Sequence, residues 1–252
     1  MEKQEKERIR GGRMNILEAE RLSKRFGGLT AISGVNIEVE QGEILGLIGP
    51  NGAGKTTLFN LLSGAIRADT GLVRFKGQDI TGLKPHRIAR RGLARTFQSV
   101  KIFSRMSVID HVRLGYLFGR LEAGDKSEAD RVVFDILEFV GLAAMRGNRG
   151  GDLILANQKR LEVARALAAK PDLLLIDELM AGLTATEMAE AMELVKKIGR
   201  RGVTIVMIEH VMKAIMSICG RIIVLDHGLK IADGTPEEIA EDITVIEVYL
   251  GE

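Results

Sequence analysis

Short apolar runs of strand length alternate with segments of helical period along most of the chain. Alternating apolar positions predict strands at 15–21 and 31–40, and a continuous apolar run predicts a buried strand at 43–48. A helix is expected over 57–65, directly after the glycine-rich stretch at 49–57. Further strands are expected at 71–77, 172–177, 203–210, 221–228 and 229–234. This alternation of strands and helices predicts an α/β fold.

The stretch from Gln98 to about Arg165 interrupts the alternation, because it has helical periodicity and no convincing strand. Ser107 and Ser127 are each placed to cap an amphipathic helix that follows them. We therefore expect a helical subdomain over 98–165, inserted into an α/β core made of 14–97 and 166–252.

Three further helix starts are marked by capping residues or proline. Pro85 occupies the first position of a short helix in "PHRIARRG". Thr184 and Glu187 form a capping box for a helix that we expect to end at Ile198. Thr235 is expected to begin the last helix of the chain.

Composition narrows the class of protein. Of the 252 residues 46% are hydrophobic, enough for one large domain or two lobes, and the net charge of +2 gives no overall attraction to nucleic acid or to an anionic membrane. The one cysteine, Cys219, excludes an internal disulfide and is expected to be a buried thiol. No run of about 18 apolar residues is present, and the charged residues 1–13, a predicted mobile arm before Met14, lack the apolar core of a signal peptide. We expect a soluble, intracellular protein.

The stretch "GPNGAGKTT" carries the most informative chemistry. It comprises Gly49, Pro50, Asn51, Gly52, Ala53, Gly54, Lys55, Thr56 and Thr57. Its glycine spacing, followed by lysine and threonine, is the phosphate-binding loop pattern, in which backbone N–H groups wrap the β-phosphate. Lys55 can then reach the β- and γ-phosphates, and the Thr56 hydroxyl can bind Mg²⁺. The sequence therefore predicts a nucleoside triphosphate site.

Two acids follow the apolar strand in "LLLIDE". Successive strand residues point to opposite sides, so Asp177 and Glu178 have different tasks. Asp177 is placed to hold Mg²⁺ through water, and Glu178 is placed to polarise the attacking water.

Gln98 and His210 also lie at predicted strand ends. The Gln98 amide could touch Mg²⁺ and the water, and a neutral His210 imidazole could contact the γ-phosphate. Spacing alone does not separate these roles from structural ones, because a lone histidine at a strand end is usually structural.

Taken together, the chain from Met14 onward resembles the nucleotide-binding subunits of ATP-binding cassette (ABC) transporters. The resemblance rests on the order of the phosphate loop, Gln98, a signature segment at 153–158, the acidic strand and His210. It implies a P-loop NTPase core with an antiparallel β subdomain and the inserted helical subdomain. It also implies that Gln98, Glu178 and His210 are catalytic, that Thr56, Gln98 and Asp177 hold Mg²⁺, and that Phe26 stacks on the adenine of ATP.

Within that family, "GLARTFQ", "IEHVM" and the closing "VYLGE" look like the importers of branched-chain amino acids. The resemblance implies an ATPase on the cytoplasmic, inner face of the cell membrane. Its implied partners are a second ABC ATPase subunit, identical or different, and transmembrane permease subunits. Through these it would serve a periplasmic or extracellular solute-binding protein. Another solute, such as urea, an amide or a lipid, remains an alternative, because other subunits choose the substrate.

The signature segment departs from the family pattern. Leu-Ser-Gly-Gly-Gln, or Leu-Ser-Tyr-Gly-Gln, is replaced by Leu153, Ile154, Leu155, Ala156 and Asn157. In the family, the serine hydroxyl and the glycine N–H groups bind the γ-phosphate of ATP held by the opposing subunit. Ile154 lacks that hydroxyl, and Leu155 adds bulk where a backbone must approach closely. Asn157 is still expected to cap the helix that follows.

These departures suggest an asymmetric pair of subunits. The phosphate loop, Glu178 and His210 of this chain are intact, whereas the ATP of the partner would face the altered segment and hydrolyse slowly. The alternative is that main-chain contacts suffice and the second site is merely weakened. Leu179 and Thr184 also differ from the family, which has proline and Asp or Asn at these positions.

Two rival functions use the same loop. A GTPase would need the guanine-reading Asn-Lys-x-Asp motif, which the sequence lacks, and neither a GTPase nor a small-molecule kinase explains the helix after Asn157. A soluble cassette ATPase that acts on nucleic acid would use the basic cluster Arg87, Arg90, Arg91 and Arg95. Such clusters are mostly solvated faces, so we expect no nucleic-acid partner.

The mechanism that the resemblance implies is ATP-driven closure of two cassettes. Gln98 and the helical block would transmit that motion to the permease. Ile102, Phe103 and Met106 are expected to be exposed and to form the docking groove.

Overall fold

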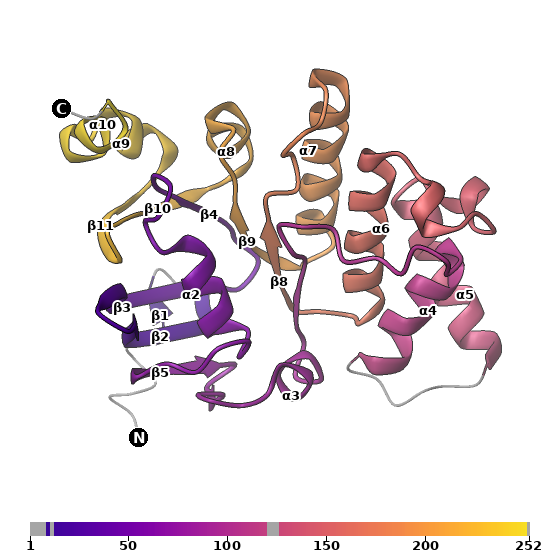
Figure 1. The fold of residues 1–252 in the computed structure, drawn as a ribbon, viewed down its shortest axis with the longest axis horizontal. Coiled ribbons are helices and arrows are strands. Elements are labelled where there is room, and N and C mark those ends of the chain that lie inside the picture. Colours follow the sequence, from indigo (N-terminus) through magenta and orange to yellow (C-terminus); the bar gives the residue numbers. More distant parts are fainter. Residues whose placement is uncertain (1–8, 11–12, 120–125, 251–252) are drawn as a thin grey trace.

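The computed structural model describes residues 9–10, 13–119 and 126–250 (Figure 1). The strands are β1 (Ile9–Arg10), β2 (Arg13–Phe26), β3 (Leu29–Glu40), β4 (Ile44–Ile48), β5 (Thr70–Phe75), β6 (Gln78–Asp79), β7 (Leu93–Arg95), β8 (Leu173–Asp177), β9 (Thr204–Ile208), β10 (Arg221–Asp226) and β11 (Leu229–Gly234). The helices are α2 (Lys55–Leu62), α3 (Pro85–Ala89), α4 (Val108–Phe118), α5 (Lys126–Phe139), α6 (Leu155–Ala168), α7 (Ala185–Arg200), α8 (Met212–Ile218), α9 (Pro236–Glu241) and α10 (Ile243–Leu250), with short 3-10 helices at Ala143–Met145 and Gly150–Asp152.

A six-stranded sheet in the order β11-β10-β4-β9-β8-β7 forms the centre of the fold. Its pairs are parallel except for β10 with β11. Every residue of β8 is buried, because the two faces of this strand pack against different layers. Leu174 and Ile176 face the helices, whereas Leu173 and Leu175 face the second sheet. The sheet therefore has a hydrophobic core on each side.

The second sheet is antiparallel and contains β1, β2, β3, β5 and β6. It shares a core with α2 and with one face of the parallel sheet, in the indigo part of Figure 1. The predicted antiparallel β region is thus present. Of the predicted mobile arm, Ile9–Arg10 pair with β2, and residues 1–8 and 11–12 lie outside the described residues.

Helices α4, α5 and α6 pack together at the opposite end of the molecule in Figure 1. Ser107 caps α4 as predicted, accepting a hydrogen bond from the Asp110 N–H at 3.2 Å. The cap predicted at Ser127 is wrong, because α5 already begins at Lys126 and Ser127 lies inside it. Serine is tolerated in a helix interior, so its presence did not fix the helix start.

The capping box of Thr184 and Glu187 is confirmed at the start of α7, which continues to Arg200 instead of ending at Ile198. A second capping box, at Thr235 and Glu238, starts α9. The prediction that this helix is the last is wrong, since α10 follows it. A break at Asp242, whose backbone is extended, separates the two helices.

Two expectations from composition concern the described part of the chain. Cys219 is buried at the end of α8, and burial raises the pKa of its thiol to about 12. Among the described residues, no helix is both long enough and apolar enough to cross a bilayer.

Candidate active site

The phosphate loop connects β4 to α2, and its shape requires glycine at two places. Gly49 has a φ of 146°, and a Cβ atom there would overlap the Leu225 carbonyl oxygen. Gly54 has a φ of 102°, and a Cβ atom there would lie 2.5 Å from the Ala31 carbonyl oxygen. Because both glycines lack a side chain, the loop can lie this close to the neighbouring backbone. The N-terminus of α2 then faces the space that the loop encloses.

Lys55 lies at the first position of α2 and is buried. Its Nζ atom donates to the carbonyl oxygens of Gly49 at 2.7 Å and Pro50 at 2.9 Å. Burial lowers the pKa of Lys55, and the nearby Glu178 and Asp177 oppose that shift. The ammonium group is therefore held inside the loop, in a position suited to binding an anion.

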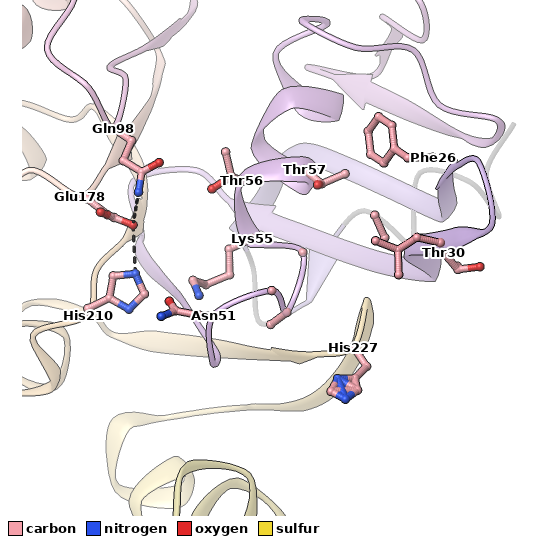
Figure 2. Close-up of a pocket in the computed structure, with 15 residues that line it drawn as sticks. Phe26, Thr30, Asn51, Lys55, Thr56, Thr57, Gln98, Glu178, His210 and His227 are labelled. Atoms are coloured by element: carbon pink, nitrogen blue, oxygen red, sulfur yellow. Dashed lines mark hydrogen bonds and ion pairs between the residues drawn. The ribbon is translucent and has the colours of Figure 1, made fainter. Parts of the chain in front are cut away.

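One cavity of about 700 Å³ joins the loop to four of the other predicted site residues, whereas Gly49, Pro50 and Asp177 do not line it (Figure 2). From the loop it is lined by Asn51, Gly52, Ala53, Gly54, Lys55, Thr56 and Thr57, and from elsewhere in the chain by Phe26, Gln98, Glu178 and His210. Phe26 lies at the end of β2 and is 49% exposed, and the Lys24 Nζ atom lies 5.5 Å from the ring centre. The cavity thus has an aromatic side and a polar, carboxylate-bearing side.

Glu178 is the centre of the polar side, as the dashed lines in Figure 2 show. Its Oε1 atom accepts from the Gln98 Nε2 atom at 3.0 Å and lies 2.9 Å from the His210 Nε2 atom. Gln98 lies in the loop after β7, not at the strand end itself, because β7 ends at Arg95. Three segments far apart in the sequence therefore meet at one carboxylate.

Asp177 has different partners, as expected, although Glu178 lies beyond the end of β8 in a left-handed turn and does not continue the strand. Its side chain is buried, and its Oδ2 atom accepts from the Arg95 Nη2 atom at 2.8 Å. Burial raises the pKa of Asp177, and the hydrogen bond from Arg95 opposes this shift. The Oδ1 atom is also buried and accepts no hydrogen bond from any residue in the described part of the chain.

Arg95 is a buried residue of the site, so the prediction that it belongs to a solvated basic cluster is wrong. Its side chain is only 7% exposed. Nη1 donates to Asn60 Oδ1 at 2.6 Å, and the guanidinium lies between two aromatic rings, with its carbon 5.6 Å from the Phe59 centroid and 5.2 Å from the Phe97 centroid. The position of Arg95 on β7, three residues before Gln98, separates it from the other arginines, but only the pairing of β7 with β8 shows that it points inward.

Three further polar residues, which no motif in the sequence indicates, support the two acids. The Thr96 hydroxyl accepts from the Asp177 N–H at 3.1 Å. Lys159 and Glu209 are buried behind Glu178. Glu209 directly precedes His210 in the sequence, and this adjacency is the one feature that could have indicated a role for Glu209.

The altered signature segment lies outside the cavity, at the start of α6. Ile154 is 63% exposed and Leu155 is 42% exposed, whereas Leu153 and Ala156 are buried. The predicted Asn157 cap is wrong, because α6 begins at Leu155 and Ile154 is its N-cap residue, without a side-chain hydrogen bond. The Asn157 Nδ2 atom instead lies 3.4 Å from the Met145 sulfur.

The predicted docking residues are exposed to different degrees. Phe103 is 58% exposed, whereas Ile102 and Met106 are half-buried. Ile102 packs against the core beside α4 and α6, which explains its lower exposure. Of the two unusual residues after the acids, Leu179 is buried in that same core and Thr184 caps α7.

The phosphate loop shares its cavity with a carboxylate that a histidine and a glutamine contact. This arrangement defines the class of P-loop nucleoside triphosphatases. The ABC transporter family matches residues 32–181, and the branched-chain amino acid ATP-binding cassette transporter family matches residues 230–252. The chain therefore belongs to the ABC transporter ATPases, which bind and hydrolyse ATP to drive transport.

Relatives of known description agree with that assignment. The chain is 41% identical to the high-affinity branched-chain amino acid transport ATP-binding protein BraF of Pseudomonas aeruginosa and 39% identical to LivG of Escherichia coli, in both cases over 94% of this chain and 98% of the relative. The ADP conformation of MJ1267, an ATP-binding cassette of an ABC transporter, superposes with a TM-score of 0.85 at 30% identity, over 95% of this chain and all of that one. The predicted fold class is thus confirmed.

Proposed function

We propose that this chain is the ATP-hydrolysing subunit of a branched-chain amino acid importer. The observation that carries the proposal is its 41% identity, over nearly the whole length of both chains, to a transport ATP-binding protein for these solutes. The match of the branched-chain family at residues 230–252 supports the same solute class. A permease in the cell membrane, a second ATPase subunit and an external solute-binding protein complete the proposed system, with this chain on the cytoplasmic face.

In the proposed reaction, ATP lies in the cavity with its base on Phe26 and its phosphates in the loop at 49–57. Lys55 leaves the loop carbonyls to contact the β- and γ-phosphates. Glu178 polarises the water that attacks the γ-phosphorus, and the bond to the ADP oxygen breaks. Gln98 and His210 orient the Glu178 carboxylate, because each lies within hydrogen-bond distance of its Oε1 atom.

The same residues suit Mg²⁺. The buried, unpartnered Oδ1 atom of Asp177 is an orphan acceptor of the type that a hydrated cation satisfies. Thr56 and Gln98 line the cavity, and each carries an oxygen that can bind a cation. We propose that these three residues hold the ion, which would neutralise charge on the phosphates.

Residues 98–165 are proposed to carry motion from the nucleotide to the permease. Gln98, which contacts Glu178, begins this stretch, and the exposed Phe103 lies five residues further on. Ile102 and Met106 flank Phe103 and would complete the docking surface.

The decisive experiment is transport by the reconstituted complex. We expect vesicles that contain the permease, this chain and the second ATPase subunit to accumulate labelled leucine, isoleucine or valine when ATP and the solute-binding protein are present. Urea and lipid should not compete with this uptake. A complex that hydrolyses ATP but moves none of the three amino acids would overturn the solute assignment. ATPase activity that responds to DNA or RNA instead would favour the rival function.

We further propose that the two nucleotide sites of the assembled pair are unequal. The N-cap of α6 is an exposed isoleucine without a side-chain hydrogen bond, where the family resemblance implies a serine that binds the ATP of the partner. Loss of one preorganised donor to a transition state typically lowers the rate by about 100- to 1,000-fold.

Ile154→Ser tests the inequality. In a complex whose copy of this chain also carries Glu178→Gln, the remaining hydrolysis comes from the ATP of the partner subunit. There Ile154→Ser is expected to raise the rate by about 100-fold, whereas the matched control Ile154→Val is expected to leave it unchanged. Equal rates for both variants would eliminate the asymmetric pair.

A further inference from the structure

Two oppositely charged side chains are buried behind the Glu178 turn. Glu209 is 2% exposed and Lys159 is 6% exposed, and neither lines the cavity. Charged side chains are seldom buried to this extent unless another group compensates the charge. The groups that Glu209 and Lys159 contact therefore indicate the role of these two residues.

Glu209 follows β9 and connects the two segments that carry Glu178 and His210. Its Oε1 atom accepts from the Met180 N–H at 2.8 Å, two residues beyond Glu178. The backbone N–H of His210 and the charge of Lys159 also stabilise the Glu209 carboxylate. The Glu178 N–H completes the connection by donating to the Ile208 carbonyl at 2.9 Å.

Lys159 connects α6 to the same turn. Its Nζ atom donates to the Glu178 carbonyl oxygen at 2.7 Å. Glu178 has a φ of 50°, in the left-handed region that a residue other than glycine adopts only when its surroundings hold it there. In this conformation the Glu178 carbonyl oxygen accepts the hydrogen bond from Lys159 and a longer one, at 3.4 Å, from the Ala181 N–H.

Burial is unfavourable for both charges. Desolvation raises the pKa of Glu209 to about 7, and it lowers the pKa of Lys159. Buried groups of opposite charge can often be replaced by apolar residues of similar volume without loss of stability. Stability alone therefore does not explain why these two charged residues are buried here. Their contacts on both sides of Glu178 do explain it.

We propose that Lys159 and Glu209 are positioning residues that hold the Glu178 turn in its left-handed conformation, so that the carboxylate meets Gln98 and His210. The pair links α6, the Glu178 turn and the His210 segment into one unit. This inference rests on the proposed role of Glu178 in hydrolysis.

The first test compares catalysis with stability in the assembled complex. Lys159→Met is expected to lower kcat by about 10- to 100-fold, as for the loss of one charge-assisted hydrogen bond. The KM for ATP should change by less than about twofold, because Lys159 does not line the cavity. Lys159→Arg keeps a cationic donor and should retain most of the activity. Lys197→Met, at an exposed position of α7, is the matched control and should behave as wild type.

A double variant separates positioning from structural support. Lys159→Met with Glu209→Leu removes both buried charges, so its melting temperature should recover relative to Lys159→Met alone, while kcat stays low. Recovery of kcat together with the melting temperature would overturn the proposal, since the pair would then serve stability only.

A crystal structure of Lys159→Met gives a readout that does not depend on hydrolysis. We expect the Glu178 φ to leave the left-handed region and its contacts with Gln98 and His210 to lengthen. An unchanged Glu178 turn would overturn the positioning role even if the Lys159→Met complex has lost activity. Absence of hydrolysis in the wild-type complex would instead refute the proposed function, while the crystal structures would still decide the positioning role.

Discussion

Replacing Glu178 with glutamine is expected to lower the rate of ATP hydrolysis by about 100- to 10,000-fold and to leave ATP binding intact. Glutamine keeps the size of the side chain and one oxygen that can accept from Gln98 or His210. It removes the negative charge that polarises water. Because Lys55 and the loop glycines are untouched, the affinity for nucleotide should stay within a few-fold of wild type.

The measurement pairs steady-state hydrolysis with equilibrium binding of a fluorescent ATP analogue. Glu237→Gln, an exposed change on α9, is the control for loss of one carboxylate. Retention of more than about a tenth of the wild-type rate would mean that another group activates the water. Loss of binding in parallel with hydrolysis would show that Glu178 shapes the nucleotide site itself.

The parts of the fold that the sequence predicts are those with local causes. The continuous apolar run at 173–176 is typical of a buried parallel strand. Gly49 and Gly54 adopt loop conformations with positive φ that other residues resist. The Thr184 capping box likewise acts within four consecutive residues. These features can therefore be predicted from nearby residues alone.

The failures share a different cause. Asn157 and Ser127 are good capping residues by type, but packing of α6 and α5 sets where these helices begin. Arg95 was grouped with Arg87 and Arg90 because they are neighbours in sequence, and only strand pairing shows that Arg95 points inward. Glu209 and Lys159 meet the Glu178 turn across long sequence separations, so no local pattern shows their burial.

Arg95→Met is expected to lower the free energy of unfolding by about 3–5 kcal/mol, as for the loss of one partner of a buried ion pair. Methionine fills much of the space between Phe59 and Phe97, so packing loss is small. The cost arises because the variant leaves Asp177 charged, buried and without its cation. Urea denaturation of the purified chain measures it, and Arg90→Met, an exposed neighbour, should stay within about 0.5 kcal/mol of wild type.

Adding Asp177→Asn to Arg95→Met identifies the source of the loss. If the unpaired carboxylate is responsible, the double variant regains most of the lost stability, because its amide carries no charge. It should still hydrolyse ATP poorly, since the proposed Mg²⁺ ligand is gone. If the double variant is as unstable as Arg95→Met, the bonds from Arg95 to Asn60 and Ser63 carry the stability instead. Arg95 would then anchor α2 to the sheet, and its contact with Asp177 would contribute little to folding.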